Sequence, residues 1–279
     1  KYEGTFDGKG FTISNLFIQG SQIKQVTNGA QNIGFVGVLS GKGKITHLTL
    51  ENVEILAAVS AGSNGLSGNP VSVGSFVGWQ EGGTLENCVA SGTIISSGDK
   101  NRVGGISGNV KTATITNCVS SVSITATGYD THVGGIVGAI RNNGTVNLNS
   151  CAYAGETLSS SGGSVGGIAG NYENDGGSVT TNNLFYSSSE YDGIGILPEG
   201  KTFNTKNEGN LNSENVVCQL NNGSWSDGEC SVSSSDATWS VGQTSLSMNG
   251  SDGYVVTFDA NRGTFAKETS QNKIAFAKD

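Results

Sequence analysis

The sequence predicts an all-β fold, a right-handed parallel β-helix (β solenoid) of about six coils, because two short patterns recur at a nearly fixed period. In the first pattern, whose clearest copy is residues 133–138 (VGGIVG), the final glycines lie at positions 37, 78, 108, 138 and 170. The steps between them are 41, 30, 30 and 32 residues. Each copy is too short to form a core of its own, so stacked coils must bury one continuous core.

The second pattern predicts a corner in every coil. Its last position is apolar in all six copies: Leu16, Leu48, Cys88, Cys118, Cys151 and Leu184. A position three residues earlier is apolar in five of the six, and side chains three apart cannot share one face of a straight strand. The strand must therefore bend just before the last position, at Asn15, His47, Asn87, Asn117, Ser150 and Asn183. Asparagine tolerates the left-handed backbone of a sharp corner, so we expect a ladder of stacked corner amides.

The repeats place the β-helix at residues 1–190. Within the glycine pattern we expect four side chains to point into the core, and the glycines to mark tight bends or crowded backbone. These side chains are Phe76, Ile106, Ile136 and Ile168. Residues 57–72 interrupt the period and are rich in glycine and serine, so we expect them to form a surface loop.

Composition narrows the class of protein. The 279 residues include 44 glycines and 2 prolines, only 14% are charged, and the net charge is -8. Such a mixture indicates disorder when it is aperiodic, but the regular apolar spacing favours a solenoid. The acidic balance argues against a nucleic-acid partner, and there is no run of 18 apolar residues to span a membrane. We read the start at Lys1 as a cut into a longer exported chain, and we expect a monomer.

The remainder of the chain departs from the repeat. Residues 191–248 are expected to form a capping or linker region with a short helix at 213–222, because Ser213 suits the N-cap and Val216 and Leu220 share one face. We expect this helix to cap the open end of the β-helix, where strand edges would otherwise be exposed. Residues 249–279 are expected to form a terminal β hairpin or a partial β-grasp-like module.

The glycine pattern and the segment 4–16 (GTFDGKGFTISNL) together resemble the GLUG repeat, and the resemblance covers about residues 4 to 186. That family is found in large secreted or surface-anchored bacterial proteins, including adhesin-like proteins and non-catalytic regions of some immunoglobulin A-cleaving metallopeptidases. It has no catalytic motif to carry over to this chain. Residues 254–265 (YVVTFDANRGTF) resemble the start of the Listeria-Bacteroides repeat, a small β-grasp-like surface module, although Arg262 replaces its usual glycine.

The five cysteines fall into two groups. Cys88, Cys118 and Cys151 occupy the inward column of successive coils, where stacked parallel side chains suit packing better than bonding, so we expect buried, reduced thiols. Cys218 and Cys230 lie outside the repeat, and the resemblance implies an extracellular setting. We therefore expect a disulfide between them, which a separation of 12 residues closes easily.

No catalytic, cofactor or metal site is expected. His47 fills a corner position, and the pair Asp130 and His132 has no nucleophile in the sequence pattern. The repeat cysteines are not arranged in CxxC pairs, so zinc is not expected. Glu173 and Asp175 lack the further acidic ligands that a calcium loop needs. Flat threonine arrays of the ice-binding kind match only locally, at residues 112–116 (TATIT).

One outward column deserves comparison with carbohydrate-processing β-helices. Glu81, Lys111, Arg141 and Glu173 each follow a motif glycine by three residues, and Trp79 lies one column away. The signs of the four charges favour a ladder of ion pairs on a solvated face, with Glu81 paired to Lys111 and Arg141 paired to Glu173. The alternative is a ligand face on which Trp79 stacks against a sugar ring.

The resemblance therefore implies a non-catalytic bacterial cell-surface or secreted protein, either adhesin-like or an extended module for structure or presentation. Its partners would be host or bacterial surface glycans or proteins. The alternative is a carbohydrate-binding or polysaccharide-degrading β-helix protein, which would need clustered carboxylates on one lateral face.

Overall fold

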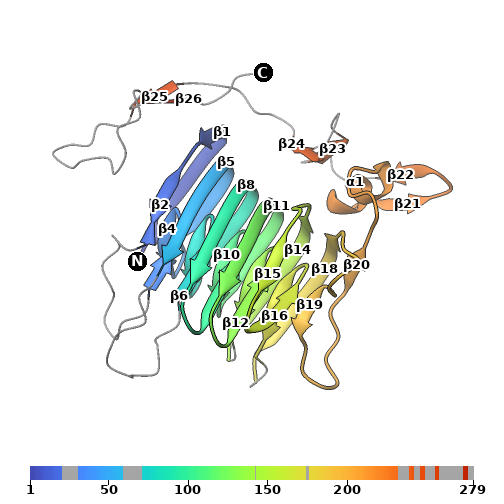
Figure 1. The fold of residues 1–279 in the computed structure, drawn as a ribbon. Coiled ribbons are helices and arrows are strands. Elements are labelled where there is room, and N and C mark those ends of the chain that lie inside the picture. Colours follow the sequence, from blue (N-terminus) through green and yellow to red (C-terminus); the bar gives the residue numbers. More distant parts are fainter. Residues whose placement is uncertain are drawn as a thin grey trace.

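The computed structural model describes residues 1–20, 31–58, 71–141, 143–173, 176–231, 239–241, 246–248, 255–257 and 273–275. Most of this chain winds into a stack of coils whose strands form three parallel sheets (Figure 1). The predicted parallel β-helix is therefore confirmed. Of the predicted surface loop at 57–72, residues 59–70 lie outside the described residues.

The long sheet contains the longest strand of each coil. All its strands pair in parallel, in the order β1 (Thr5–Ser14), β5 (Lys44–Ala58), β8 (Thr84–Ser97), β11 (Ala113–Thr127), β14 (Thr145–Tyr153), β18 (Ser178–Tyr186) and β20 (Thr205–Asn207). Two short strands extend it: β2 (Phe17–Gln19) pairs with β5, and β15 (Leu158–Ser160) pairs with β11.

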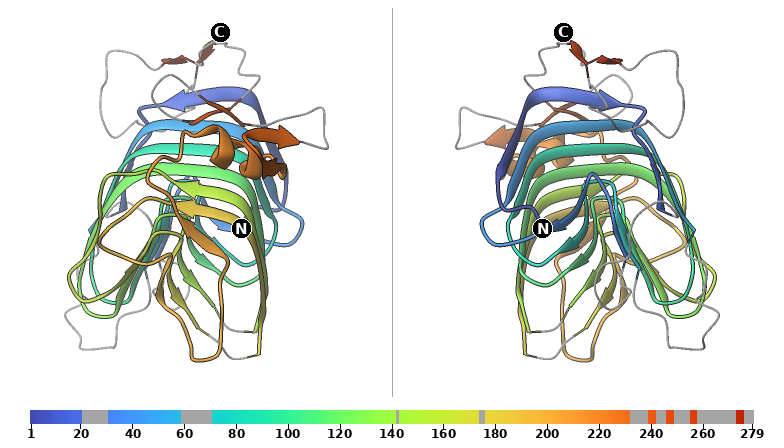
Figure 2. Two further views of the ribbon diagram at one scale, coloured as in Figure 1. Left: turned by 90° about the vertical axis from the view of Figure 1, so that its right-hand side faces the viewer. Right: turned by 90° about the vertical axis from the view of Figure 1, so that its left-hand side faces the viewer.

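Two sheets of short strands complete the coils. The second sheet has the order β19 (Ile194–Ile196), β17 (Ala169–Tyr172), β13 (Val137–Ile140), β10 (Ser107–Val110), β7 (Val77–Gln80) and β4 (Val36–Leu39). The third sheet has the order β16 (Gly163–Gly166), β12 (Thr131–Gly134), β9 (Asn101–Gly104), β6 (Val71–Gly74) and β3 (Gln31–Ile33). Viewed along the stack, the long strands arch over the short ones (Figure 2). The parallel ladders continue through β19 and β20, past the expected boundary at residue 190.

The predicted corners in the long strands are confirmed. All six corner residues have positive φ, between 48° and 59°: Asn15, His47, Asn87, Asn117, Ser150 and Asn183. The residue after each corner turns into the core, and Leu48, Cys88, Cys118, Cys151 and Leu184 are fully buried there. A left-handed residue thus reverses the alternation of the strand and lets side chains three apart share the interior.

The corner amides form only part of the expected ladder. Asn117 donates from Nδ2 to Oδ1 of Asn87 at 3.2 Å, and Nδ2 of Asn87 lies 2.8 Å from Nε2 of His47. The ladder stops at the next coil because the short side chain of Ser150 donates instead to Asn222 at 3.0 Å. Oδ1 of Asn117 is buried without a partner at that break.

The glycine pattern forms the turn between the third and second sheets. In the copy at 133–138 it spans the end of β12 and the start of β13, with Gly135 and Ile136 in the turn between them. Ile136 is fully buried, as are Phe76, Ile106 and Ile168, so their predicted inward direction is confirmed. A Cβ atom on Gly135 would lie 2.2 Å from the carbonyl oxygen of Gly167 and 2.3 Å from the Tyr153 ring. This glycine is therefore required by crowding between coils.

The short helix lies on the side of the stack, not across its end. α1 (Glu214–Leu220) begins after the N-cap Ser213, whose hydroxyl accepts from the Val216 amide at 3.3 Å. Its apolar face packs with Trp239 against an outward column that runs across three successive coils: Val119, Ala152 and Phe185. Contrary to the expected end cap, the helix covers this apolar column on the outer side of the long sheet. Tyr191 and Phe203 pack beside the last coils instead, against Tyr186 and Tyr172.

A disulfide joins Cys218 of α1 to Cys230, with their Cα atoms 5.7 Å apart. Cys230 belongs to the antiparallel pair β21 (Ser224–Ser226) and β22 (Glu229–Ser231). The strands β23 (Trp239–Val241) and β24 (Leu246–Met248) also pair in antiparallel fashion, as do β25 (Val255–Thr257) and β26 (Lys273–Ala275). The other three cysteines, Cys88, Cys118 and Cys151, are free and buried, as the repeat column predicted.

Candidate functional site

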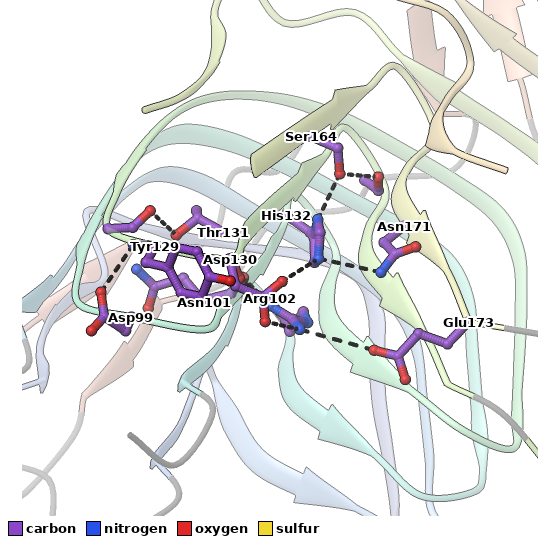
Figure 3. A network of polar contacts seen from close by, with 12 residues as sticks. Asp99, Asn101, Arg102, Tyr129, Asp130, Thr131, His132, Ser164, Asn171 and Glu173 are labelled. Carbon is purple, nitrogen blue, oxygen red and sulfur yellow. Dashed lines mark hydrogen bonds and ion pairs between the residues drawn. The ribbon is translucent and has the colours of Figure 1, made fainter. Parts of the chain in front are cut away.

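A network of buried polar side chains lies where the second and third sheets face each other (Figure 3). Arg102, His132 and Ser164 are in register on β9, β12 and β16, so they form one column of the third sheet. Asn171 of β17 and Glu173, just beyond β17, meet this column from the second sheet. The network therefore cross-links two sheets and several coils.

Arg102 is the central cation of the network, with only 6% of its side chain exposed. Its Nη2 lies 3.0 Å from Oδ2 of Asp130 and 3.9 Å from Oε1 of Glu173, and its Nη1 donates to the Asp130 carbonyl. Burial alone would raise the pKa of Asp130, but the hydrogen bond and charge of Arg102 hold it below its ordinary value. The positive charge of the guanidinium is thus compensated by the carboxylates of Asp130 and Glu173.

His132 is held on both ring nitrogens. Its Nδ1 lies 2.6 Å from Oγ of Ser164, and its Nε2 lies 3.0 Å from Oδ1 of Asp130 and 3.2 Å from Nδ2 of Asn171. Burial lowers the pKa of His132, and the charge of Arg102 acts in the same direction, against the effect of Asp130. The imidazole is therefore neutral at neutral pH.

Ser164, His132 and Asp130 form a chain of contacts that has the order of a catalytic triad. No nucleophile for the Asp130–His132 pair was evident from the sequence pattern, because Ser164 lies one coil away. However, the Ser164 hydroxyl also lies 2.6 Å from the Gly170 carbonyl, which is a second acceptor for its single proton. His132 is only 5% exposed, and through the contacts with Gly170 and Asn171 this chain joins the third sheet to the second.

The predicted outward column is only partly paired as expected. Arg141 and Glu173 do form an ion pair, with 2.8 Å between Nη1 and Oε1. Glu81 pairs with Lys1 and not with Lys111, so the other expected pair is wrong. The bond from Lys1 holds the pKa of Glu81 below its ordinary value, with smaller contributions in that direction from Trp79 and Lys111. Lys111 is exposed and forms no ion pair within the described ranges.

The proposed ligand face therefore does not form one cluster. Trp79 is half-buried on β7, in register with Asn109, while Glu173 belongs to the Arg102 network several coils away. His47 is a corner residue, near Asp7 and Asn87. Asp175, the second candidate calcium ligand, lies outside the described residues.

Arg102, the residue around which the network is built, was not predicted from the sequence motifs. Arg102 precedes His132 by 30 residues, which is one step of the period, so their stacking could have been read from the spacing. The contact between Arg102 and Glu173 could not have been read from the spacing, because it depends on how two sheets pack face to face.

Within the parts of the chain that the structure describes, no group of three or more His, Cys, Asp or Glu side chains is placed to hold a metal ion. Those parts also contain no helix with the length and apolar character needed to cross a membrane.

The stacked coils, the buried glycine turns and the left-handed corners define the class, a parallel β-helix built from a glycine-containing repeat. Residues 69–95 match the family model described as the GLUG motif, so the chain contains that motif. A stretch of 93 residues, 33% of the chain, is 38% identical to halomucin from Haloquadratum walsbyi, and it spans only 1% of that protein's length. A crystal structure of a proposed immunoglobulin A1 protease from Bacteroides ovatus superposes with a TM-score of 0.47 at 17% identity, over 88% of this chain and 77% of that one.

Proposed function

We propose that this β-helix is a non-catalytic module of a surface-associated or secreted protein, with an adhesin-like or presenting role. One observation carries the proposal. In the main cluster of charged side chains, Arg102 and His132 are buried and paired with the partly exposed Asp130 and Glu173, so the cluster braces the stack. The GLUG motif and the similarity to part of halomucin support the surface association.

A rigid stack suits presentation because its length grows by about 4.8 Å for each added coil, with side chains repeated along each face. No part of that role requires a reactive group. Partners would be glycans or proteins of a host or bacterial surface, met by the outward faces of the coils.

The test has two arms. Antibodies against the chain should label intact, unpermeabilised cells that produce it, and labelling only after permeabilisation would overturn the surface association. In the second arm, the purified 279-residue chain is incubated with acidic and neutral polysaccharides and with immunoglobulin A. We expect no cleavage; cleavage that is lost in Ser164→Ala or Asp130→Asn would show that the module is catalytic.

A further inference from the structure

A depression on the outer surface follows from unequal turn lengths between the second and the long sheet. In the second sheet, the register aligns the last residues of four neighbouring strands: Leu39, Gln80, Val110 and Ile140. In the long sheet, it aligns four residues near the start of the strands: Lys44, Thr84, Thr114 and Asn147. The segments between the strands are residues 40–43, 81–83, 111–112 and 141–144, which are four, three, two and four residues long, and residue 142 lies outside the described residues. Two short turns therefore lie between two longer ones, and the walls are roughly 14 Å apart, three coil spacings.

The lining of this depression is polar and almost uncharged. It has a volume of about 400 Å³, and its polar side chains are Lys42, Thr84, Thr112, Thr114, Thr145 and Asn147. The five uncharged groups can both donate and accept hydrogen bonds. Gly41 and Gly83 also line it.

Lys42 is the one charged side chain in this lining. Neighbouring lysines are occupied, because Lys44 pairs with Glu86 at 2.6 Å and Lys1 pairs with Glu81. Lys42 is exposed and forms no ion pair in the described part of the chain. Glu3, which lies beside Gly41, accepts a hydrogen bond from Ser40 at 3.1 Å.

The chemistry of the lining selects among ligand classes. An apolar ligand would need an apolar lining, and a phosphate would need several converging cations or free backbone amides. A polyhydroxylated ligand with a single carboxylate matches five hydroxyl or amide groups and one ammonium. We propose that the depression binds an acidic saccharide of the uronic-acid class, with Lys42 at its carboxylate and the threonine and asparagine side chains at its hydroxyls. This inference rests on the proposed surface function and names its partner class.

The test is a titration of the full chain with oligogalacturonate, followed by NMR chemical-shift changes, with a neutral galacto-oligosaccharide of equal length as comparison. Lys42→Gln and Thr114→Val should each raise the Kd by about 2- to 13-fold, the range for loss of one hydrogen bond. The matched controls are Lys201→Gln and Thr125→Val, which replace exposed residues outside the depression and should leave the Kd unchanged. Circular dichroism melting of every variant establishes that it folds.

Absence of binding to oligogalacturonate, or binding unaffected by both variants, would overturn the inference and leave the surface association to be decided by the antibody labelling. Equal binding of the neutral oligosaccharide would overturn the role of Lys42 and the acidic ligand class.

Discussion

Arg141 and Glu173 lie 32 residues apart in sequence, and their side chains meet on adjacent coils with 2.8 Å between Nη1 and Oε1. Glu173 also lies 3.9 Å from Arg102 on the facing sheet. This one carboxylate therefore joins the exposed column to the buried network.

Arg141→Ala should lower the free energy of unfolding by up to about 1 kcal/mol, because 32% of the Arg141 side chain is exposed and solvent weakens such pairs. Lys111→Ala is the matched control from the same column and should have almost no effect, since Lys111 forms no ion pair in the described residues. Urea unfolding of both variants measures the difference. A larger loss for Lys111 would contradict the pairing.

Ile136→Ala should cost roughly 2–5 kcal/mol, because the fully buried side chain would leave a cavity between coils. Ile95→Ala is the control: its side chain is 49% exposed, so its loss should cost well under 1 kcal/mol. Equal costs in denaturant titrations would mean that the glycine turn does not face the core.

The three repeat cysteines should resist thiol reagents in the folded protein. Burial raises the pKa of Cys118 well above its ordinary value, and the stacked thiols of Cys151 and Cys88 act in the same direction. Because thiolate is the reactive form, iodoacetamide should label these sites only after unfolding. Mass spectrometry without reductant should find them free while Cys218 and Cys230 remain linked; fast native labelling would contradict the stacking.

Stability should fall on mild acidification because of His132. Its folded pKa lies below the ordinary 6.5, so as pH falls below about 6.5 the unfolded chain takes up a proton that the folded chain resists. His132 therefore makes its full contribution to the free energy of unfolding above pH 6.5, and this contribution is lost as the pH falls toward the folded pKa. Comparison of wild type with His132→Gln at pH 7 and pH 5 checks this: the variant should lose less stability. Asp130, whose folded pKa is also lowered, adds a loss of the same sign below about pH 3.8.

The features that depend on one coil and its period were predictable from sequence. Asn87 and Asn117 indicated corners because the left-handed backbone restricts the residue type, and Ile136 indicated the core because it repeats. Features that depend on packing between distant surfaces were not predictable. The pairing of Glu81 with Lys1 and of Arg102 with Glu173 follows from how turns and sheets meet in space, and no local pattern reports it.

The position of α1 affects how the molecule unfolds under mechanical force. In a stack of coils each unit contacts only its neighbours, so coils can detach one at a time from an end. The helix touches side chains from β11, β14 and β18 at once, and a disulfide ties it to the following hairpin. Detaching the coil of β18 by itself would separate the helix from either β18 or the coils of β11 and β14. The C-terminal coils should therefore unfold as one cooperative unit, whereas the first coils should detach one at a time.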